Sequence, residues 1–157
     1  MNETQQKAMQ KAIHLSIESV KNGGGPFGAV ILKDGKEVAA GWNQVTQKLD
    51  PTAHAEVTVI REAAQALGTF DLSGCEIYSS CEPCPMCLSA IYWARIDKLY
   101  YANTKDDAAK IGFDDSFIYD QLDLPEDKRS IPVTKMMRDE ALEAFRLWNQ
   151  KEDKIEY

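Results

Sequence analysis

Two cysteines and a histidine in this chain have the types and spacing of ligands for a single zinc ion. Cys84 and Cys87 lie three positions apart, and a cysteine pair at this spacing can bind one metal. Zinc also accepts histidine nitrogen, and His54 is the candidate third ligand because Glu56 follows it by two residues. Three protein ligands leave a fourth position for water, which is typical of a catalytic zinc site rather than a structural one.

Other histidine and cysteine side chains are weaker ligand candidates. Cys81 is a rival, because it also lies three positions from Cys84, but we expect it to be buried at the end of a strand. His14 falls in a predicted helix where no cysteine or carboxylate clusters around it, so we interpret it as a partly exposed helix residue. Cys75 is predicted to belong to the core.

Glu56 is the candidate proton carrier beside this site. A bound zinc lowers the pKa of water from about 15.7 to about 7, and a neighbouring carboxylate can complete the deprotonation. The pattern H-x-E followed by P-C-x-x-C resembles the signature of zinc nucleobase deaminases. In that chemistry Glu56 takes the proton from water, delivers it to a ring nitrogen and helps the amine to leave as ammonia.

The bulk properties predict a small globular protein without a nucleic-acid partner. At 157 residues the chain is long enough for one domain with a proper core. The net charge of −7 and the absence of a Lys/Arg cluster favour a small-molecule substrate over a phosphate backbone. No apolar run reaches the roughly 18 residues of a membrane span, and the N-terminal residues lack the apolar core of a signal peptide. We therefore expect a cytoplasmic protein with no membrane partner.

Hydrophobic periodicity and turn residues predict alternating helices and strands. Residues 54 and 56 fall on the first turn of a predicted helix, and Cys84 and Cys87 fall at the start of another, so both helix starts can present ligands. The predicted helices are from about 3 to 21, from Thr52 or Ala53 to Leu67, from Cys84 or Pro85 to Arg95 and over 138–150, with a short helical pattern within 105–124. The predicted strands are 27–33, 36–42, 75–80 and 97–103, with a short one over 131–137. A loop is predicted over 45–52 and a polar connection over 124–130.

This order of elements indicates an α/β domain. Strands that alternate with helices predict a mixed sheet with helices on both faces, and the Asp34-Gly35 pair predicts a hairpin at one side. The last helix, over 138–150, is predicted to turn Ala141, Leu142, Phe145 and Trp148 inward. Since both metal-bearing helices follow loops, their starts can converge at one edge of the sheet.

Several residues near the predicted site have two interpretations from pattern alone. Phe27 is either a core residue or a wall against which a flat ring stacks. Asn43, at the end of a predicted strand, is either a turn residue or a pocket amide. Asp114 and Asp115 form either a solvated turn or an acidic pocket wall.

Beyond these local patterns, the chain resembles the bacterial guanine deaminases of the cytidine deaminase-like superfamily over nearly its whole length. The segments that carry the resemblance are 25–30, 50–57, 80–87, 90–95, 112–119 and the terminal pair Glu156 and Tyr157. The first three are shared in looser form with tRNA adenosine deaminases and cytosine deaminases. The resemblance implies a three-layer α/β/α cytidine deaminase-like fold with a mixed five-stranded sheet, Zn²⁺ as cofactor and a free purine base, guanine, as substrate.

The resemblance also implies roles for individual residues. It implies Glu56 and Asp115 as catalytic residues and His54, Cys84 and Cys87 as metal ligands. The substrate contacts that it implies are Phe27, Asn43, Trp93, Asp114 and Tyr157. It further implies a homodimer in which a C-terminal segment, about 130–157, crosses to the partner.

Three other functions share part of this pattern. A tRNA adenosine deaminase uses the same metal and glutamate, but it should carry a basic surface. A cytosine-type deaminase has the same zinc centre and differs only in its pocket. A binding module with a structural zinc needs a fourth protein ligand, for which Cys81 is the candidate, and gives Glu56 no role.

Overall fold

The computed structural model describes residues 2–157, which form two compact units, one up to Asp115 and the other Ser116–Tyr157. In the first unit the sheet has four strands, in the order β2-β1-β3-β4. They are β1 (Gly28–Lys33), β2 (Lys36–Trp42), β3 (Cys75–Cys81) and β4 (Lys98–Asn103). The pairs β1/β2 and β1/β3 are antiparallel and β3/β4 is parallel, so the sheet is mixed, as predicted.

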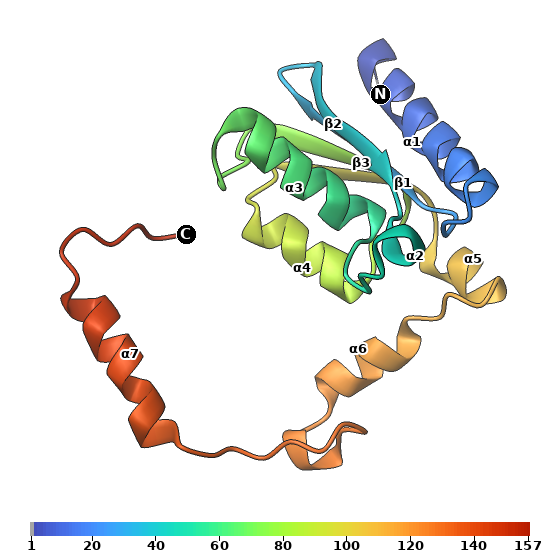
Figure 1. Cartoon of the computed structure of the whole chain (residues 1–157). Helices are drawn as coiled ribbons and strands as arrows, with labels where there is room; N and C mark the ends of the chain where they lie inside the picture. Colours follow the sequence, from blue (N-terminus) through green and yellow to red (C-terminus); the bar gives the residue numbers. More distant parts are fainter. Residues whose placement is uncertain (1) are drawn as a thin grey trace. The chain divides into compact units, whose positions relative to one another are not determined.

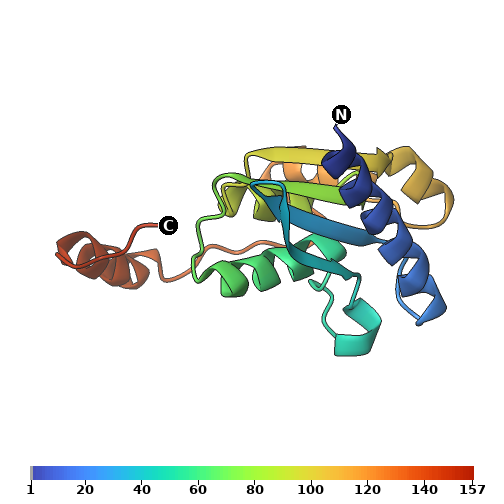
Figure 2. The ribbon, with the colours of Figure 1, turned by 90° about the horizontal axis from the view of Figure 1, so that it is seen from above.

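Helices cover both faces of this sheet, which confirms the three-layer architecture (Figure 1, Figure 2). On one face α1 (Glu3–Lys21) buries Ala8 and Ala12 against Val30 and Tyr78. On the other, α3 (Ala55–Leu67) and α4 (Pro85–Trp93) pack over the side chains of Ile31 and Ile77 in the larger core cluster. The sheet therefore separates two apolar cores.

Glycine makes the close approach of α1 to the sheet possible. A Cβ atom on Gly28 would lie 2.3 Å from the carbonyl oxygen of Ala12 and 2.7 Å from the amide nitrogen of Ser16. Those distances are far inside normal contact, so the start of β1 can touch the α1 backbone only because this residue has no side chain.

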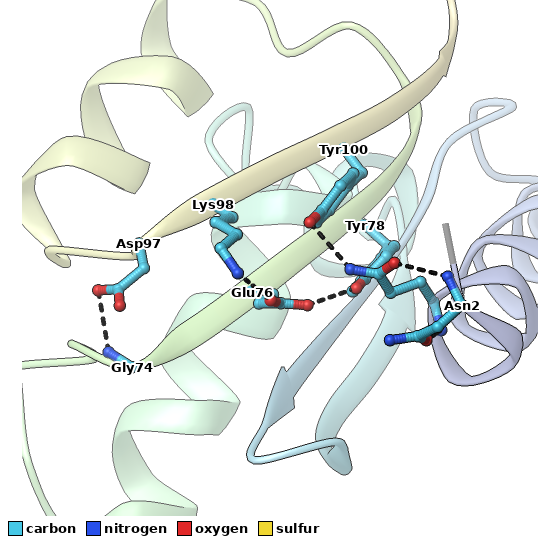
Figure 3. Close-up of polar contacts among 8 residues, drawn as sticks. Asn2, Gly74, Glu76, Tyr78, Asp97, Lys98 and Tyr100 are labelled. Carbon is cyan, nitrogen blue, oxygen red and sulfur yellow. Dashed lines mark hydrogen bonds and ion pairs between the residues drawn. The ribbon is translucent and has the colours of Figure 1, made fainter.

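A polar network joins α1 to the starts of β3 and β4 (Figure 3). The rings of Tyr78 and Tyr100 stack with centroids 4.8 Å apart. The Tyr78 hydroxyl donates to Glu76 over 2.6 Å, and Lys98 lies 2.9 Å from the same carboxylate. Gln5 on α1 donates to the Tyr100 hydroxyl over 3.0 Å. Glu76 and Lys98 lie at the starts of β3 and β4, whereas the metal-binding motif follows the other end of β3.

Three predictions about the sheet and its connections differ from the structure. The fifth strand is missing: within residues 2–157 the sheet has four strands, and 131–137 is irregular, because a strand needs a neighbour for its backbone hydrogen bonds. The predicted loop 45–52 contains a one-turn helix, α2 (Val45–Lys48), too short to show a helical period. Helix α3 begins at Ala55 rather than at Thr52 or Ala53, which makes His54 its N-cap.

After β4 the chain continues as α5 (Lys105–Lys110), which begins after its N-cap Thr104 and is the last helix described in the first unit. The second unit contains α6 (Ser116–Asp123), the 3₁₀ helix η1 (Glu126–Lys128) and α7 (Arg138–Gln150). Helix α7 has the bounds predicted from sequence, but its predicted inner face is wrong: Ala141 is exposed, Leu142 is only half-buried, and Phe145 and Trp148 are 73% and 42% exposed. The unit itself offers no sheet against which this face can be buried.

No described helix is both long enough and apolar enough to cross a membrane.

Candidate active site

The predicted metal ligands sit at the N-terminal ends of α3 and α4. His54 is the N-cap of α3 and Cys84 the N-cap of α4, both in extended backbone conformation, and Cys87 lies in the first turn of α4. Pro85 occupies the first helical position, where its missing N–H costs little. Among residues 2–157, neither N-cap side chain makes a capping hydrogen bond, so both stay available to a metal.

The three ligand atoms are spaced as a tetrahedral zinc site requires. Nδ1 of His54 lies 3.5 Å from Sγ of Cys84 and 3.5 Å from Sγ of Cys87, and all three atoms fall within 4.8 Å of one another. Zn–N and Zn–S bonds of about 2.05 and 2.3 Å at tetrahedral angles place nitrogen and sulfur about 3.6 Å apart. The residues present therefore fit zinc, with Nδ1 as the histidine donor.

Within the described chain no other histidine, cysteine or carboxylate joins this cluster. Cys81 is buried at the end of β3, as predicted, with its Sγ 3.6 Å from the carbonyl oxygen of Thr104. Cys75 is fully buried in the core and His14 is exposed on α1, also as predicted. The candidate fourth ligand of a structural site, Cys81, is thus not placed with the other three.

Hydrogen bonding among the ligands favours the thiolate of Cys84 and the protonated forms of Cys87 and His54. The bond from Cys87 lowers the pKa of Cys84 to about 4, and a bond to His54 acts in the same direction. The pKa of Cys87 is raised by the same contact with Cys84 and by burial. The bond to Cys84 raises the pKa of His54. A metal that binds here displaces the remaining protons, because only thiolate and neutral imidazole can ligate it.

Glu56 lies at the second position of α3, buried beside the ligands and only 5% exposed. Its Oε1 accepts a hydrogen bond of 2.8 Å from the Ser79 hydroxyl. Burial raises the pKa of Glu56, while hydrogen bonds from its own backbone N–H, Ser79 and Cys87 oppose that shift. A carboxylate with a raised pKa can hold a proton nearer to neutral pH, as a general acid–base must.

Aromatic and amide side chains lie where β1 begins and β2 ends. The ring of Phe27 meets the ring of Phe113 edge to face, with centroids 5.0 Å apart. The backbone N–H of Asn43 donates to the carbonyl of Phe27 over 3.0 Å, which ties the two residues together. The Oδ1 atom of buried Asn43 accepts from the backbone N–H of Val45, so its Nδ2 group is the part left to donate.

The remaining predicted site residues are spread more widely. Asp115 is half-buried, and burial followed by the negative charge of Cys84 raises its pKa, which places it within electrostatic reach of the ligands. Asp114 is exposed in the same turn. Trp93 is 68% exposed at the last residue of α4, and nine helical residues carry it about 13 Å along the axis from the Cys84 end. Tyr157 belongs to the second unit and is exposed.

Sequence reasoning missed two residues that the structure brings to this region. Ser79 lies in the middle of β3, where a serine carries no motif, and only the packing of α3 on the sheet reveals its contact with Glu56. Phe113 precedes the two aspartates, and its contact with Phe27 joins positions far apart in sequence. A polar residue in a buried strand was the one available signal for Ser79.

The comparisons with known proteins agree with this geometry. Residues 2–103 match the model of the cytidine and deoxycytidylate deaminase zinc-binding region, and the chain belongs to that family. Within it, the chain is 52% identical to the guanine deaminase of Bacillus subtilis (strain 168), over 95% of this chain and 96% of that protein. The X-ray structure of guanine deaminase from Bacillus subtilis superposes with a TM-score of 0.95 at 51% identity and covers 100% of this chain and 99% of its own.

More distant relatives include a guanine deaminase from Nitrosomonas europaea, whose structure matches with a TM-score of 0.67 at 33% identity over 90% of this chain and 82% of its own. A tRNA-specific adenosine deaminase of Agrobacterium fabrum is 49% identical, but only over 48% of this chain and 50% of that protein. The similarity to the guanine deaminase of Bacillus subtilis therefore covers nearly the whole chain, whereas that to the tRNA enzyme covers about half of it.

Proposed function

We propose that this chain is a zinc-dependent guanine deaminase that converts guanine and water into xanthine and ammonia. The observation that carries the proposal is the buried Glu56 carboxylate placed beside three ligand atoms with zinc spacing. A structural zinc site would have no use for that carboxylate. The full-length similarity to a guanine deaminase supports the choice of substrate.

The metal ligands and Glu56 have separate roles in the proposed reaction. Zinc held by His54, Cys84 and Cys87 would supply an acidified water as nucleophile. Glu56, whose Oε1 is held by the Ser79 hydroxyl, would accept a proton from that water and deliver it to a ring nitrogen. The same carboxylate would then take the second proton of the added water and give it to the amine, which leaves as ammonia.

The pocket residues suit an oxo-purine. Guanine presents two acceptors, O6 and N7, on one edge, and the Nδ2 group of Asn43 is a donor whose direction is set by the bond at Oδ1. The edge-to-face pair of Phe27 and Phe113 offers apolar surface to a flat ring. Asp115 is assigned to the substrate's amino side, since its raised pKa lets it carry a proton there. Contacts from Asp114 and Trp93 stay predictions.

We also propose that the chain works as a homodimer to which the C-terminal segment contributes, with Tyr157 closing a pocket. Every residue of Ser116–Tyr157 is exposed or half-buried, including the apolar face of α7. A 13-residue helix is only marginally stable in water without a packed apolar face. A second copy of the chain is the partner that we expect to bury it.

Release of ammonia by the purified, zinc-loaded protein tests the proposed function. Guanine, cytosine, adenine and tRNA are offered separately, and we expect turnover of guanine. Turnover of another base would keep the zinc chemistry and reject the assigned pocket. If the zinc-loaded protein releases ammonia from none of the four substrates, a binding module with a structural zinc becomes the favoured interpretation.

A further inference from the structure

Strand β3 presents two serines to opposite faces of the sheet. Ile77 belongs to the core cluster under α3 and α4, and Tyr78 to the cluster under α1. Because side chains alternate along a strand, Ser79 points to the α3 side and Ser80 to the α1 side. Both are 1% exposed. A serine on a face that otherwise packs apolar side chains against α3 calls for a hydrogen-bond partner, since an unpaired buried hydroxyl is costly.

The partner of Ser79 is the functional carboxylate. Its hydroxyl donates to Oε1 of Glu56 over 2.8 Å, and both residues are buried. Glu56 has three rotatable side-chain bonds, so a carboxylate on the first turn of α3 would have several orientations open to it. The bond from Ser79 on β3, an inner strand of the sheet, fixes Oε1 and so restricts these orientations.

We propose that Ser79 is a positioning residue for deamination, which holds the Glu56 carboxylate in the orientation that proton transfer requires. The inference rests on the proposed function and on the role given to Glu56 there. A base must lie within about 2.6–3.2 Å of the proton that it abstracts, so a small rotation of the carboxylate removes it from range. Partners that orient the residues of a metal site change activity by about tenfold to a hundredfold when they are lost.

The alternative is that Ser79 has a purely structural role and only provides a hydrogen bond to a buried carboxylate. In that case its loss lowers stability and leaves the chemical step alone. The neighbouring Ser80 supplies the matched control: it has the same residue type, strand and burial, but its hydroxyl accepts from the backbone N–H of Gly28 over 3.0 Å. The two serines therefore separate a general loss of buried hydrogen bonding from a loss of orientation at Glu56.

The experiment compares Ser79→Ala, Ser79→Thr and Ser80→Ala with the wild type. Zinc content, the thermal unfolding midpoint, kcat and KM are measured for each. We expect Ser79→Ala to bind zinc fully and to lose kcat by about tenfold to a hundredfold, with KM within about twofold. Ser79→Thr keeps the hydroxyl and should recover most of kcat. Ser80→Ala should lower the unfolding midpoint and keep kcat within about twofold.

The inference is overturned if kcat of Ser79→Ala stays within twofold of wild type, or if both alanine variants lose kcat equally. A loss of kcat that follows a loss of zinc, or a change in KM alone, also overturns it. Failure of Ser79→Thr to restore kcat at an unchanged unfolding midpoint also overturns it. If the extra methyl group of Ser79→Thr lowers the unfolding midpoint, the role of Ser79 is judged from Ser79→Ala and Ser80→Ala alone. All assays use the base that the wild type deaminates. A wild type inactive on every base refutes the proposed function itself, while an active wild type with an unaffected Ser79→Ala refutes only this inference.

Discussion

Replacing Gly28 by alanine should destabilise the protein strongly, because α1 lies directly on this residue. The new Cβ would lie 2.3 Å from the carbonyl oxygen of Ala12, about 1 Å short of the 3.4 Å at which ordinary contact begins. Helix α1 must move away by that amount, and a gap of this size forfeits about a quarter to a half of each dispersion contact around Ala8 and Val30. Overpacking usually costs about 1–3 kcal/mol, and backbone atoms cannot yield as side chains do, so we expect at least about 3 kcal/mol.

Thermal unfolding of the zinc-loaded protein measures this cost. For a chain of this size about 3 kcal/mol corresponds to a midpoint lower by about 6–12 °C. Gly41→Ala is the matched control: this residue pairs with Ala29 on β1, but its new Cβ would have its nearest contact at 3.5 Å, with Cγ1 of Val59. We expect the control to change stability by less than about 1 kcal/mol. Equal midpoints for the two variants would refute the close packing of α1 on β1.

Three further outcomes are expected. Glu56→Gln should keep zinc and lose turnover by about 10²–10⁴-fold. Because burial raises the pKa of Glu56, its ionised side chain destabilises the fold at neutral pH. The zinc-free variant should therefore unfold at a higher temperature than the zinc-free wild type. Unchanged turnover would falsify the role given to Glu56. Deletion of Glu156 and Tyr157 should reduce guanine turnover far more than stability, and equal losses would make the tail structural. Glu76→Gln should cost about 1–2 kcal/mol at pH 7. The hydrogen bond from Tyr78 lowers the pKa of Glu76, so this cost should be present above its ordinary value of 4.5 and vanish as the pH falls through the lowered value; a urea-unfolding difference that persists in acid would contradict it.

Local sequence signals predicted most of the helices and strands. Helix α1, strand β2 and helix α7 have the predicted bounds, because apolar periodicity and the Asp34-Gly35 turn are local properties. The metal ligands were predictable for a similar reason, since their residue types and spacing are constrained by zinc itself. The start of α3 was placed too early because Thr52 is a plausible N-cap, whereas the chain uses His54 in extended conformation.

What the sequence did not predict depends on contacts between distant segments. The segment 131–137 has strand-like residues, but it finds no strand to pair with within the described chain. The exposed face of α7 shows the same dependence on a partner. Ser79 and Phe113 acquire their contacts with Glu56 and Phe27 only when helix and strand are packed, and no local pattern encodes that. Likewise, α2 is a single turn that carries no readable period.

The use of His54 and Cys84 as N-caps has an electrostatic consequence for the metal. Each helix N-terminus carries an effective charge of roughly half a unit, and α3 and α4 both direct this end at the ligands. Together they amount to about one positive charge, enough to offset one of the two thiolates that ligate a zinc ion. A site with two anionic sulfurs would otherwise leave the ion with little net charge to acidify water. The two helix ends thus restore part of the positive potential that the sulfur ligands remove, and with it part of the ability of a bound ion to acidify water.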